Sequence, residues 1–444
     1  MIKFFKQIYF SPLFFTVGII VVILYVVGFF FPVFQTLAFI ALLFWAGLTI
    51  IDFSLLFSQK NGIIAERLTL DKLSNGDNNT VDILLENNFP FVIDYTIIDE
   101  LPFQFQKRDF KLSGKIKAGE KKAEHYTLIP KERGEYNFGN HNVFTKSPIG
   151  FVTKRWIFSS GVTLPVYPGF LQMRKYELMA ISNRLHDLGV KKIRKIGNNR
   201  EFEQIKEYVK GDDYRTINWR ATARRSKLMV NQYQDEKAQP VYTIIDMGRA
   251  MKMPFNGMTL LNYAINASLV LSNIALIKDD KAGLVTFEKK VRTIVKARKR
   301  RTHIKTILEV LYNQKTTFSE SNFEHLYVLT KKHITQRSLF VLFTNFETTD
   351  SLNRQLPFLL QMAKQHLLIT VFFKNKELEE YMLEPADNLV DVYKQTIAEK
   401  YLLEKQNMMK KLRNYGIQTI YTTPEELTVN TINKYIEVKA RGLF

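Results

Sequence analysis

Two apolar runs near the start of the chain are the strongest feature of its hydrophobic pattern. Residues 13–31 and 33–51 contain no charged side chain and are nineteen residues long each, enough for a helix to cross ~30 Å of hydrocarbon. Pro32 separates them and predicts a break between two antiparallel helices. We therefore expect a transmembrane helical hairpin within residues 1–60. Buried soluble helices explain the pattern less well, because they would need a partner core on every side. A cleaved signal peptide also fits less well, because bulky residues at 29–32 stand where a signal peptidase needs small ones.

Charged residues around these runs predict the orientation of the hairpin. Lys3 and Lys6 precede the first run, Lys60 and Arg67 follow the second, and the connection carries no charge. Because basic residues stay on the cytoplasmic side, we expect both termini and the remaining domains in the cytoplasm. The two runs contain no carboxylate, histidine or lysine to relay ions, which argues against a channel or transporter.

From residue 61 to about 170 the pattern changes to short stretches with apolar residues at every second position, such as Val81, Ile83 and Leu85. This period is typical of strands with one buried face. Turn-forming residues recur between the stretches. We expect a β-sandwich-like domain of roughly seven antiparallel strands.

Over residues 240–444, buried strands alternate with longer helical segments. This alternation predicts a C-terminal α/β, Rossmann-like domain whose parallel sheet is covered by helices on both faces. Ligands of such sheets bind at the carboxyl ends of the strands, where the sequence places Asp246, Thr344 and Asn345. The chain contains no glycine-rich phosphate loop, no H-E-x-x-H and no G-x-S-x-G, so we expect neither an enzyme nor a cofactor.

A connecting segment over residues 171–239 contains the most distinctive sequence of the chain, E-Y-V-K-G-D-D-Y-R-T-I-N-W-R-A-T-A-R-R. Aromatic residues among cations can form a platform for nucleic acid. The same residues can instead form a buried network, in which an aspartate pairs with an arginine and Trp219 packs into a core, and we favour this structural interpretation. The positions of interest are Gly211, Asp212, Asp213, Arg215, Trp219 and Arg224.

The charge balance adds one constraint. Sixty-three lysines and arginines against 43 acidic residues give a formal net charge of +20, a field that attracts phosphates, anionic headgroups or acidic proteins without selecting one of them. The chain has no cysteine, which excludes disulfides, thiolate zinc sites and a cysteine nucleophile.

The arginine-rich block, followed by a strand that ends in Asp246, resembles the bacterial family called domain of unknown function 58. E-R-G-E-Y-N-F-G from Glu132 and S-P-I-G-F from Ser147 are also similar to that family. So is the order of parts, which are two spans, a β-rich region, the arginine block and a domain resembling von Willebrand factor A. The resemblance covers nearly the whole chain. It implies a bacterial inner-membrane protein that partners a MoxR-type AAA+ ATPase in the assembly or maturation of other proteins, often in envelope stress.

The von Willebrand factor A resemblance implies a metal-ion-dependent adhesion site built from D-x-S-x-S, a threonine on a second loop and an aspartate on a third. Such oxygen ligands suit a hard divalent ion. This chain keeps Asp246 but has Gly248 and Ala250 in place of the serines and Asn345 in place of the later aspartate. We therefore interpret the site as degenerate, kept for folding or for metal-free protein contact, with Mg²⁺ only as a weak alternative. The candidates for the threonine position are Thr316 and Thr317.

An anchor, a basic surface and the lack of a catalytic constellation suit an adaptor better than an enzyme. We expect a membrane-anchored cytosolic scaffold that binds an acidic face of the ATPase or of its client. The main alternative is a membrane-tethered nucleic-acid-binding protein, suggested by the net charge and by Trp219, and a metal-dependent hydrolase ranks last. A basic run supplies candidate contacts, unless it is simply solvated or faces lipid headgroups: Lys296, Arg298, Lys299, Arg300 and Arg301.

Overall fold

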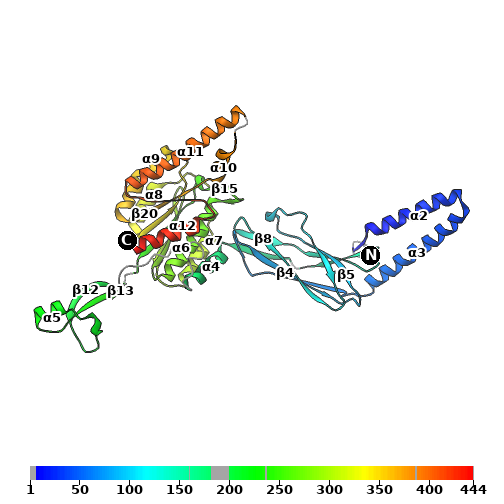
Figure 1. Cartoon of the computed structure of the whole chain (residues 1–444), viewed down its shortest axis with the longest axis horizontal. Coiled ribbons are helices and arrows are strands. Elements are labelled where there is room, and N and C mark those ends of the chain that lie inside the picture. The colour runs from blue at the N-terminus through cyan, green and yellow to red at the C-terminus, as the bar shows by residue number, and fades with distance from the viewer. Residues whose placement is uncertain (1–6, 160, 182–199, 236–237, 386–387, 444) are drawn as a thin grey trace. The chain divides into compact units, whose positions relative to one another are not determined.

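The computed structural model describes residues 7–159, 161–181, 200–235, 238–385 and 388–443. The chain divides into two compact units, Met1–Tyr167 and Pro168–Phe444. Figure 1 shows the elements of each unit in their order along the chain.

The first unit begins with a short strand and two apolar helices, β1 (Ile8–Phe10), α2 (Pro12–Phe30) and α3 (Pro32–Phe57). Ser11 caps α2 by accepting a hydrogen bond from the Phe14 amide, and a proline opens each helix. The two helices run antiparallel beside each other (Figure 1). Only 11% of the most apolar window of each helix is buried. Their exposed apolar faces fit a membrane anchor.

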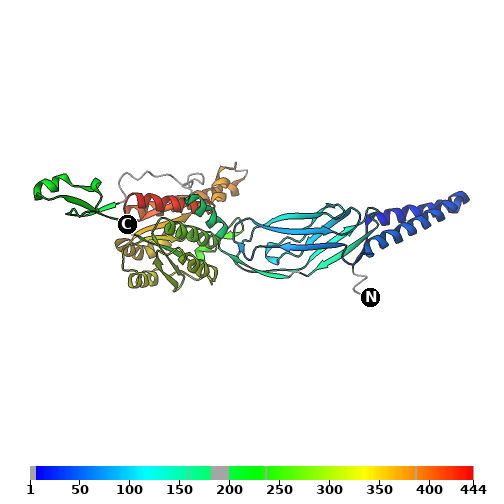
Figure 2. The same cartoon turned by 90° about the horizontal axis from the view of Figure 1, so that it is seen from below.

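A β domain makes up the rest of this unit. Its strands form one five-stranded sheet, β1-β10-β9-β5-β6, and two three-stranded sheets, β2-β4-β7 and β3-β11-β8. All of these pairings are antiparallel except that of β11 with β3. Figure 2 shows the strands side by side in blue to cyan. Within the described residues there are ten strands besides β1, more than the seven expected: β2 (Ile63–Leu68), β3 (Leu73–Ser74), β4 (Asn79–Asn87), β5 (Ile93–Asp99), β6 (Leu112–Ile116), β7 (Lys121–Leu128), β8 (Gly134–Phe138), β9 (His141–Lys146), β10 (Val152–Phe158) and β11 (Val162–Tyr167).

The predicted alternation places the core of the β domain. In β4, for example, Val81, Ile83 and Leu85 are buried while the positions between them are more exposed. Strand β1, which the sequence pattern does not reveal, pairs with β10 through Ile8 and Lys154. The chain therefore enters α2 and leaves α3 on the same side of the anchor.

The second unit is built around a six-stranded sheet in the order β18-β17-β14-β19-β20-β21. Five strands are parallel, as predicted, but β18 runs antiparallel to β17. The expectation of a purely parallel sheet is wrong there because residues 288–290, the whole connection between the two strands, are too few for a crossover. The strands are β14 (Pro240–Asp246), β17 (Lys281–Phe287), β18 (Val291–Arg298), β19 (Leu339–Phe343), β20 (Leu367–Phe373) and β21 (Gln418–Thr422).

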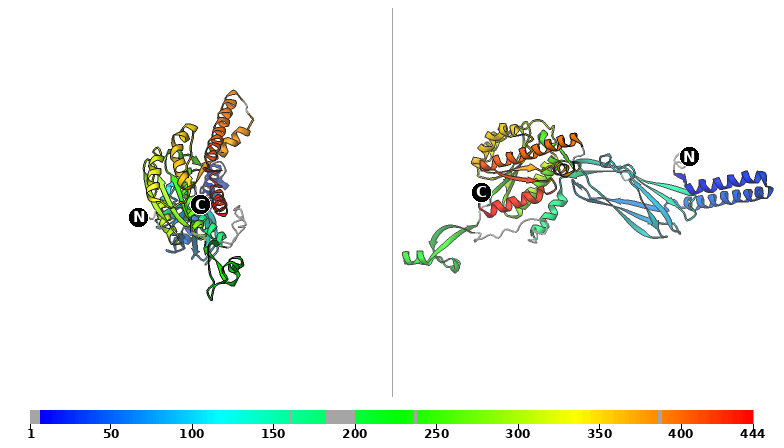
Figure 3. Two further views of the ribbon diagram at one scale, coloured as in Figure 1. Left: turned by 90° about the vertical axis from the view of Figure 1, so that its left-hand side faces the viewer. Right: turned by 45° about the horizontal axis from the view of Figure 1, so that its top comes forward.

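Helices cover both faces of this sheet (Figure 3). Helix α6 contacts α7, α12 and α4, whereas α8 and α11 contact α9. Although α6 is long and apolar enough to span a membrane, 89% of its window is buried, so it is the central core helix of this domain. The helices are α4 (Phe170–Ile181), α6 (Leu260–Ile277), α7 (His303–Tyr312), α8 (Phe323–His333), α9 (Thr349–Gln365), α10 (Lys376–Leu383), α11 (Leu389–Asn414) and α12 (Leu427–Ala440).

The arginine-rich block lies within a two-stranded antiparallel hairpin. Strands β12 (Arg200–Glu207) and β13 (Met229–Asp235) pair antiparallel. Between them stand a 3-10 turn, η3 (Tyr214–Thr216), and a short helix, α5 (Trp219–Arg225). We call residues 200–235 the arginine hairpin.

Candidate functional site

The turn at the start of the arginine hairpin's insertion depends on Gly211 and Asp212. Gly211 has a φ of 118°, a conformation that favours glycine. The Asp212 side chain accepts hydrogen bonds from the Val209 amide (3.0 Å) and the Lys206 ammonium (2.9 Å). These two interactions hold the pKa of Asp212 below its usual value. Asp212 thus pairs with a lysine, not with an arginine as expected.

Two further side chains cap the short helical pieces. Asp213 accepts a hydrogen bond from the Arg215 amide (3.0 Å) at the start of η3. The Asn218 side-chain oxygen accepts one from the Ala221 amide (3.0 Å) at the start of α5, and the Asn218 backbone amide donates to the Met229 carbonyl (2.8 Å). Short side chains with an acceptor oxygen can cap the free amides at the start of a helical turn, which explains the Asp and Asn at these positions. The polar part of the block is therefore local and structural.

Trp219 does not pack into a core. Its side chain is 70% exposed, and Tyr214 nearby in sequence is 68% exposed. The expectation that Trp219 anchors a buried network is wrong, because the insertion is too short to enclose an indole ring once its polar residues are used as caps. Arg215 and Arg224 are likewise exposed, and the Arg215 guanidinium lies 5.7 Å from the centre of the Tyr214 ring.

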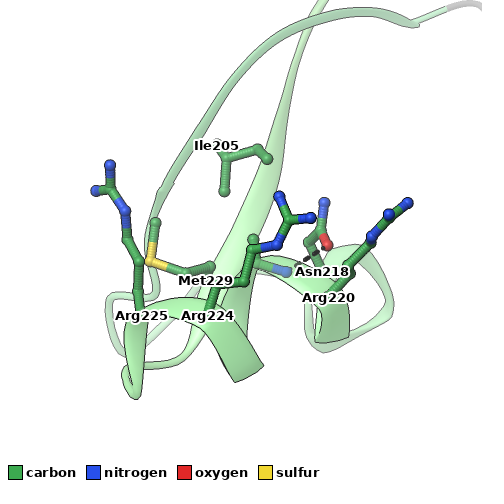
Figure 4. Close-up of a pocket in the computed structure, with 7 residues that line it drawn as sticks. Ile205, Asn218, Arg220, Arg224, Arg225 and Met229 are labelled. Atoms are coloured by element: carbon green, nitrogen blue, oxygen red, sulfur yellow. Dashed lines mark hydrogen bonds between the residues drawn. The ribbon is translucent and has the colours of Figure 1, made fainter.

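Three arginines of α5 line a pocket of about 270 Å³ on the hairpin. Figure 4 shows the guanidinium groups of Arg220, Arg224 and Arg225 spread along one side of the helix, with that of Arg224 between the other two. Ile205 and Met229 supply apolar lining, and Met229 is 4% exposed. The pocket combines an apolar wall with a row of cations.

Asp246 ends strand β14 at the carboxyl edge of the large sheet and is 2% exposed. One carboxylate oxygen accepts hydrogen bonds from the Gly248 amide (2.8 Å) and the Ser321 hydroxyl, and the other accepts one from the Thr344 hydroxyl (2.7 Å). Burial raises the pKa of Asp246, although these three donors act in the opposite direction. Both oxygens are therefore engaged by the protein itself.

Ser321 and Gly248 come together beside Asp246. A Cβ atom at Gly248 would lie 1.9 Å from the Ser321 Oγ and 2.9 Å from the Ser319 carbonyl oxygen. Glycine at 248 is thus required by the close approach of the 319–321 loop. The hydroxyl that bonds Asp246 thus comes from a loop distant in sequence, which positions 248 and 250 alone do not reveal.

The two candidate threonines lie near Glu288 and not on Asp246. Thr316 donates to the Met247 carbonyl, and Thr317 donates to the Glu288 carboxylate (2.6 Å). Glu288 also accepts from the Ser319 amide (2.9 Å) and pairs with the Arg292 guanidinium (2.6 Å). Burial favours a raised pKa for Glu288, but these donors outweigh it and lower the pKa to about 2.

Asn345 faces a buried lysine. The Lys405 ammonium, on α11, donates to the Asn345 Oδ1 (2.7 Å) and to the Phe346 carbonyl, and the side chain is 1% exposed. Burial lowers the pKa of Lys405 to about 8. The Asn345 amide nitrogen donates to the Ala250 carbonyl (3.4 Å). A buried ammonium group therefore stands beside Asn345.

These residues do not fit a hard divalent ion. Mg²⁺ needs several oxygen ligands with free lone pairs around one point. Here the Asp246 oxygens already accept three hydrogen bonds, and Asn345 accepts from an ammonium group. Among the residues that the structure describes, no group of three or more histidine, aspartate or glutamate side chains could hold a metal ion.

The basic run lies at the free edge of the large sheet. Lys296 and Arg298 belong to β18, the edge strand, and the other three residues follow it. All five side chains are exposed, and Lys299 pairs with Asp279 (3.4 Å). Charged residues along an edge strand also discourage pairing with a strand of another molecule, which is a structural reason for part of this run.

A contact that sequence reasoning missed joins the anchor to the β domain. The Asp52 carboxylate, on α3, is 0% exposed and accepts hydrogen bonds from the Phe151 and Val152 amides (2.7 Å each) and from the Ser147 hydroxyl. Ser11, which caps α2, donates to the Gly150 carbonyl (2.5 Å). The S-P-I-G-F segment is therefore the turn that holds both apolar helices.

Two basic residues of the first unit are held by the protein itself. The Lys154 ammonium donates to the Leu56 and Gln59 carbonyls (3.0 and 3.3 Å) at the end of α3, where a cation is favourable. Burial lowers its pKa to about 8. Arg67, one of the charges used to orient the hairpin, is buried in an ion pair with Asp99 (2.7 Å). Its charge is therefore not available to lipid headgroups.

Comparison with known proteins matches residues 204–414, from β12 to the end of α11, to the family described as "Protein of unknown function DUF58". The resemblance drawn from the arginine-rich block is confirmed at the level of the family. "Uncharacterized protein YeaD" of Bacillus subtilis (strain 168) is 25% identical over 229 residues, which are 47% of this chain and 52% of that protein. The chain thus spans about half the length of this curated relative.

Two solved structures resemble parts of the chain more remotely. An aerotolerance-related membrane protein from Bacteroides fragilis NCTC 9343 is 10% identical with a TM-score of 0.28, and the conserved hypothetical protein BatB from Bacteroides thetaiotaomicron is 8% identical with a TM-score of 0.27. Each match covers 46% of this chain and 100% of the other. TM-scores of this size support no argument about this chain.

Proposed function

We propose that this chain, which matches the DUF58 family over residues 204–414, is a membrane-anchored scaffold that binds another protein and catalyses no reaction. The α/β domain would serve as a von Willebrand factor A-like binding module. The two apolar helices form the anchor, and the hydrogen bonds of Asp52 hold it against the β domain. Such an attachment suits a protein that positions a partner at a membrane.

One observation carries the proposal, namely the state of Asp246. A catalytic or metal-binding carboxylate at the carboxyl edge of a parallel sheet needs an oxygen that can reach a ligand. Both oxygens of Asp246 are instead engaged by Gly248, Ser321 and Thr344 in a buried position. This residue acts as a structural centre that fixes three loops. The edge is then available as a shaped surface for protein contact.

The proposed partner is a MoxR-type AAA+ ATPase, as the family resemblance implies. The proposed orientation places the β domain and the α/β domain in the cytoplasm, following the lysines that flank the hairpin. Strand β1 precedes α2 and pairs with β10, which supports the idea that both ends of the anchor lie on one side of the membrane. An ATPase in the cytoplasm could reach a scaffold of this orientation.

Extraction in mild detergent followed by identification of co-purifying proteins tests the proposal. We expect an ATPase in stoichiometric amount, and no magnesium retained in the same sample. Asp246→Asn should leave the partner bound, apart from any loss caused by loosening of the loops that Asp246 holds. Glu399→Gln, an exposed substitution on α11, serves as a control. Stoichiometric magnesium lost on Asp246→Asn, or turnover of any substrate abolished by it, would overturn the proposal.

A second candidate function is membrane-tethered nucleic-acid binding. Exposure of Trp219 beside the arginines of α5 favours it, because a base can stack on an exposed indole ring. Such binding should weaken steeply as salt rises. If the detergent-extracted protein bound neither DNA nor RNA at low salt, this candidate would fail.

A further inference from the structure

The arginine hairpin contains cations that its own acidic residues leave unneutralised. Lys206 pairs with Asp212 (2.9 Å), and Lys227 pairs with Glu207 (3.0 Å). Within the described part of the chain, no acidic side chain pairs with the three arginines of α5. Local ion pairing therefore involves Lys206 and Lys227 but not the three arginines of α5.

We propose that the pocket formed by Arg220, Arg224 and Arg225 binds an acidic segment of a partner protein. This inference rests on the scaffold function proposed above and names the surface and chemistry of the contact. A guanidinium group presents a planar fork of donors that matches a carboxylate, and such charge-assisted pairs are about twice as strong as neutral hydrogen bonds. Three forks on one pocket therefore favour a ligand with several carboxylates.

The arrangement of the arginines favours an extended ligand over a single anion. The three guanidinium groups spread along one side of α5 and do not converge on one point (Figure 4). A lone phosphate would be contacted by one or two of them at most. Successive carboxylates on an extended peptide can instead each meet one fork.

The wall of the pocket favours a peptide over a nucleic-acid backbone. Ile205, which is 39% exposed, and Met229 line the same pocket as the arginines. An aliphatic or aromatic side chain between two acidic residues would bury apolar surface there, whereas a sugar-phosphate backbone offers no comparable group. Trp219 does not line this pocket, so stacking of a base is not part of its geometry.

The hairpin is better suited to this contact than the basic run at the sheet edge. The run mixes lysines with arginines along an edge strand, and Lys299 already pairs with Asp279. Lysine ammonium groups are more strongly hydrated and lack the planar fork. A run of this type protects a sheet edge without a bound partner, whereas the guanidinium groups that line the pocket form no ion pair with any acidic side chain that the structure describes.

The test uses the full-length chain in nanodiscs of zwitterionic lipid, so that anionic headgroups cannot fill the pocket. The probe is a short fluorescent peptide in which Glu alternates with Leu, and the matched peptide has Gln in place of Glu. Binding is measured by fluorescence anisotropy. We expect the acidic peptide to bind and the Gln peptide to bind at least about tenfold more weakly, because each lost charge-assisted pair lowers affinity by that order.

Variants assign the binding to the pocket. R220Q/R224Q/R225Q should weaken the acidic peptide at least about tenfold. K296Q/R298Q/R300Q removes the same number of charges from the basic run and should change the affinity less than about twofold. The triple lysine variant of the pocket keeps the charge and loses the forks, so it should be intermediate. Protection of the Asn218 amide, which bonds to the Met229 carbonyl, verifies that the hairpin is folded in each variant.

Several outcomes would overturn the assignment. These are no binding of the acidic peptide, an equal loss in the basic-run variant, unchanged binding in the triple lysine variant, or tighter binding of a single-stranded oligonucleotide at the same arginines. Failure of the scaffold function is distinguishable. If the peptide binds but no protein co-purifies, the pocket assignment is kept and the scaffold proposal fails. If a partner still co-purifies with R220Q/R224Q/R225Q, the scaffold proposal is kept and the pocket assignment fails.

Discussion

Replacing Asp52 with alanine should loosen the junction between the second apolar helix and the β domain. The substitution leaves the Phe151 and Val152 amides without their acceptor in a buried site, where both now lie 2.7 Å from one carboxylate oxygen. An unsatisfied buried donor costs about 1–3 kcal/mol, so two of them should destabilise the first unit by about 2–6 kcal/mol. Asp52→Asn keeps an oxygen that can accept from both amides, so it should cost clearly less than Asp52→Ala.

Hydrogen exchange in detergent measures this effect at the amides concerned. A loss of about 2 kcal/mol corresponds to roughly thirtyfold faster exchange at the Phe151 and Val152 amides. Asp94→Ala is a matched control, because Asp94 forms an exposed ion pair with Lys115 (3.3 Å) whose loss should change stability by less than about 1 kcal/mol. Unchanged exchange at both amides in Asp52→Ala would refute the idea that this carboxylate holds the anchor.

The remaining predictions concern the second unit. Gly248→Ser should destabilise the α/β domain by about 1–3 kcal/mol, because the new Cβ meets the Ser321 Oγ, and Ser321→Gly should restore part of the loss; a neutral Gly248→Ser in thermal melts would contradict the contact. Burial lowers the pKa of Lys405 from an ordinary 10.5 to about 8, so between these pH values the unfolded chain binds more protons than the folded one. The stability of the wild type, relative to Lys405→Met, should therefore rise with pH in this range. A stability difference that does not change with pH would count against burial of the amine. Trp219→Ala should change the free energy of unfolding by less than about 0.5 kcal/mol. Trp219→Phe should remove a fluorescence component that acrylamide quenches readily. A large destabilisation by Trp219→Ala would mean that the indole ring is packed.

Sequence reasoning predicts the candidate sites unevenly. Position 246 is found because it ends a buried strand, and loss of the serines at 248 and 250 follows directly from the sequence. Thr344 is placed at the same sheet edge by its position after a buried strand. The donor Ser321 is not found in this way, because its approach to Asp246 depends on a loop that is 75 residues distant along the chain. Trp219 illustrates the opposite error, since an aromatic residue among arginines gives no indication of whether anything covers it.

The sequence by itself determines the elements and their classes in this protein. Uninterrupted apolar runs specify the anchor, alternation with period two specifies the β strands, and buried strands between helices specify the α/β domain, because each pattern reflects local geometry and burial. Only the tertiary structure decides which polar groups meet. The burial of Asp52 against a turn 95 to 100 residues away, the reversal of β18 and the pairing of Lys405 with Asn345 (2.7 Å) all follow from long-range packing, in which a buried donor or acceptor must find a partner wherever the fold brings one.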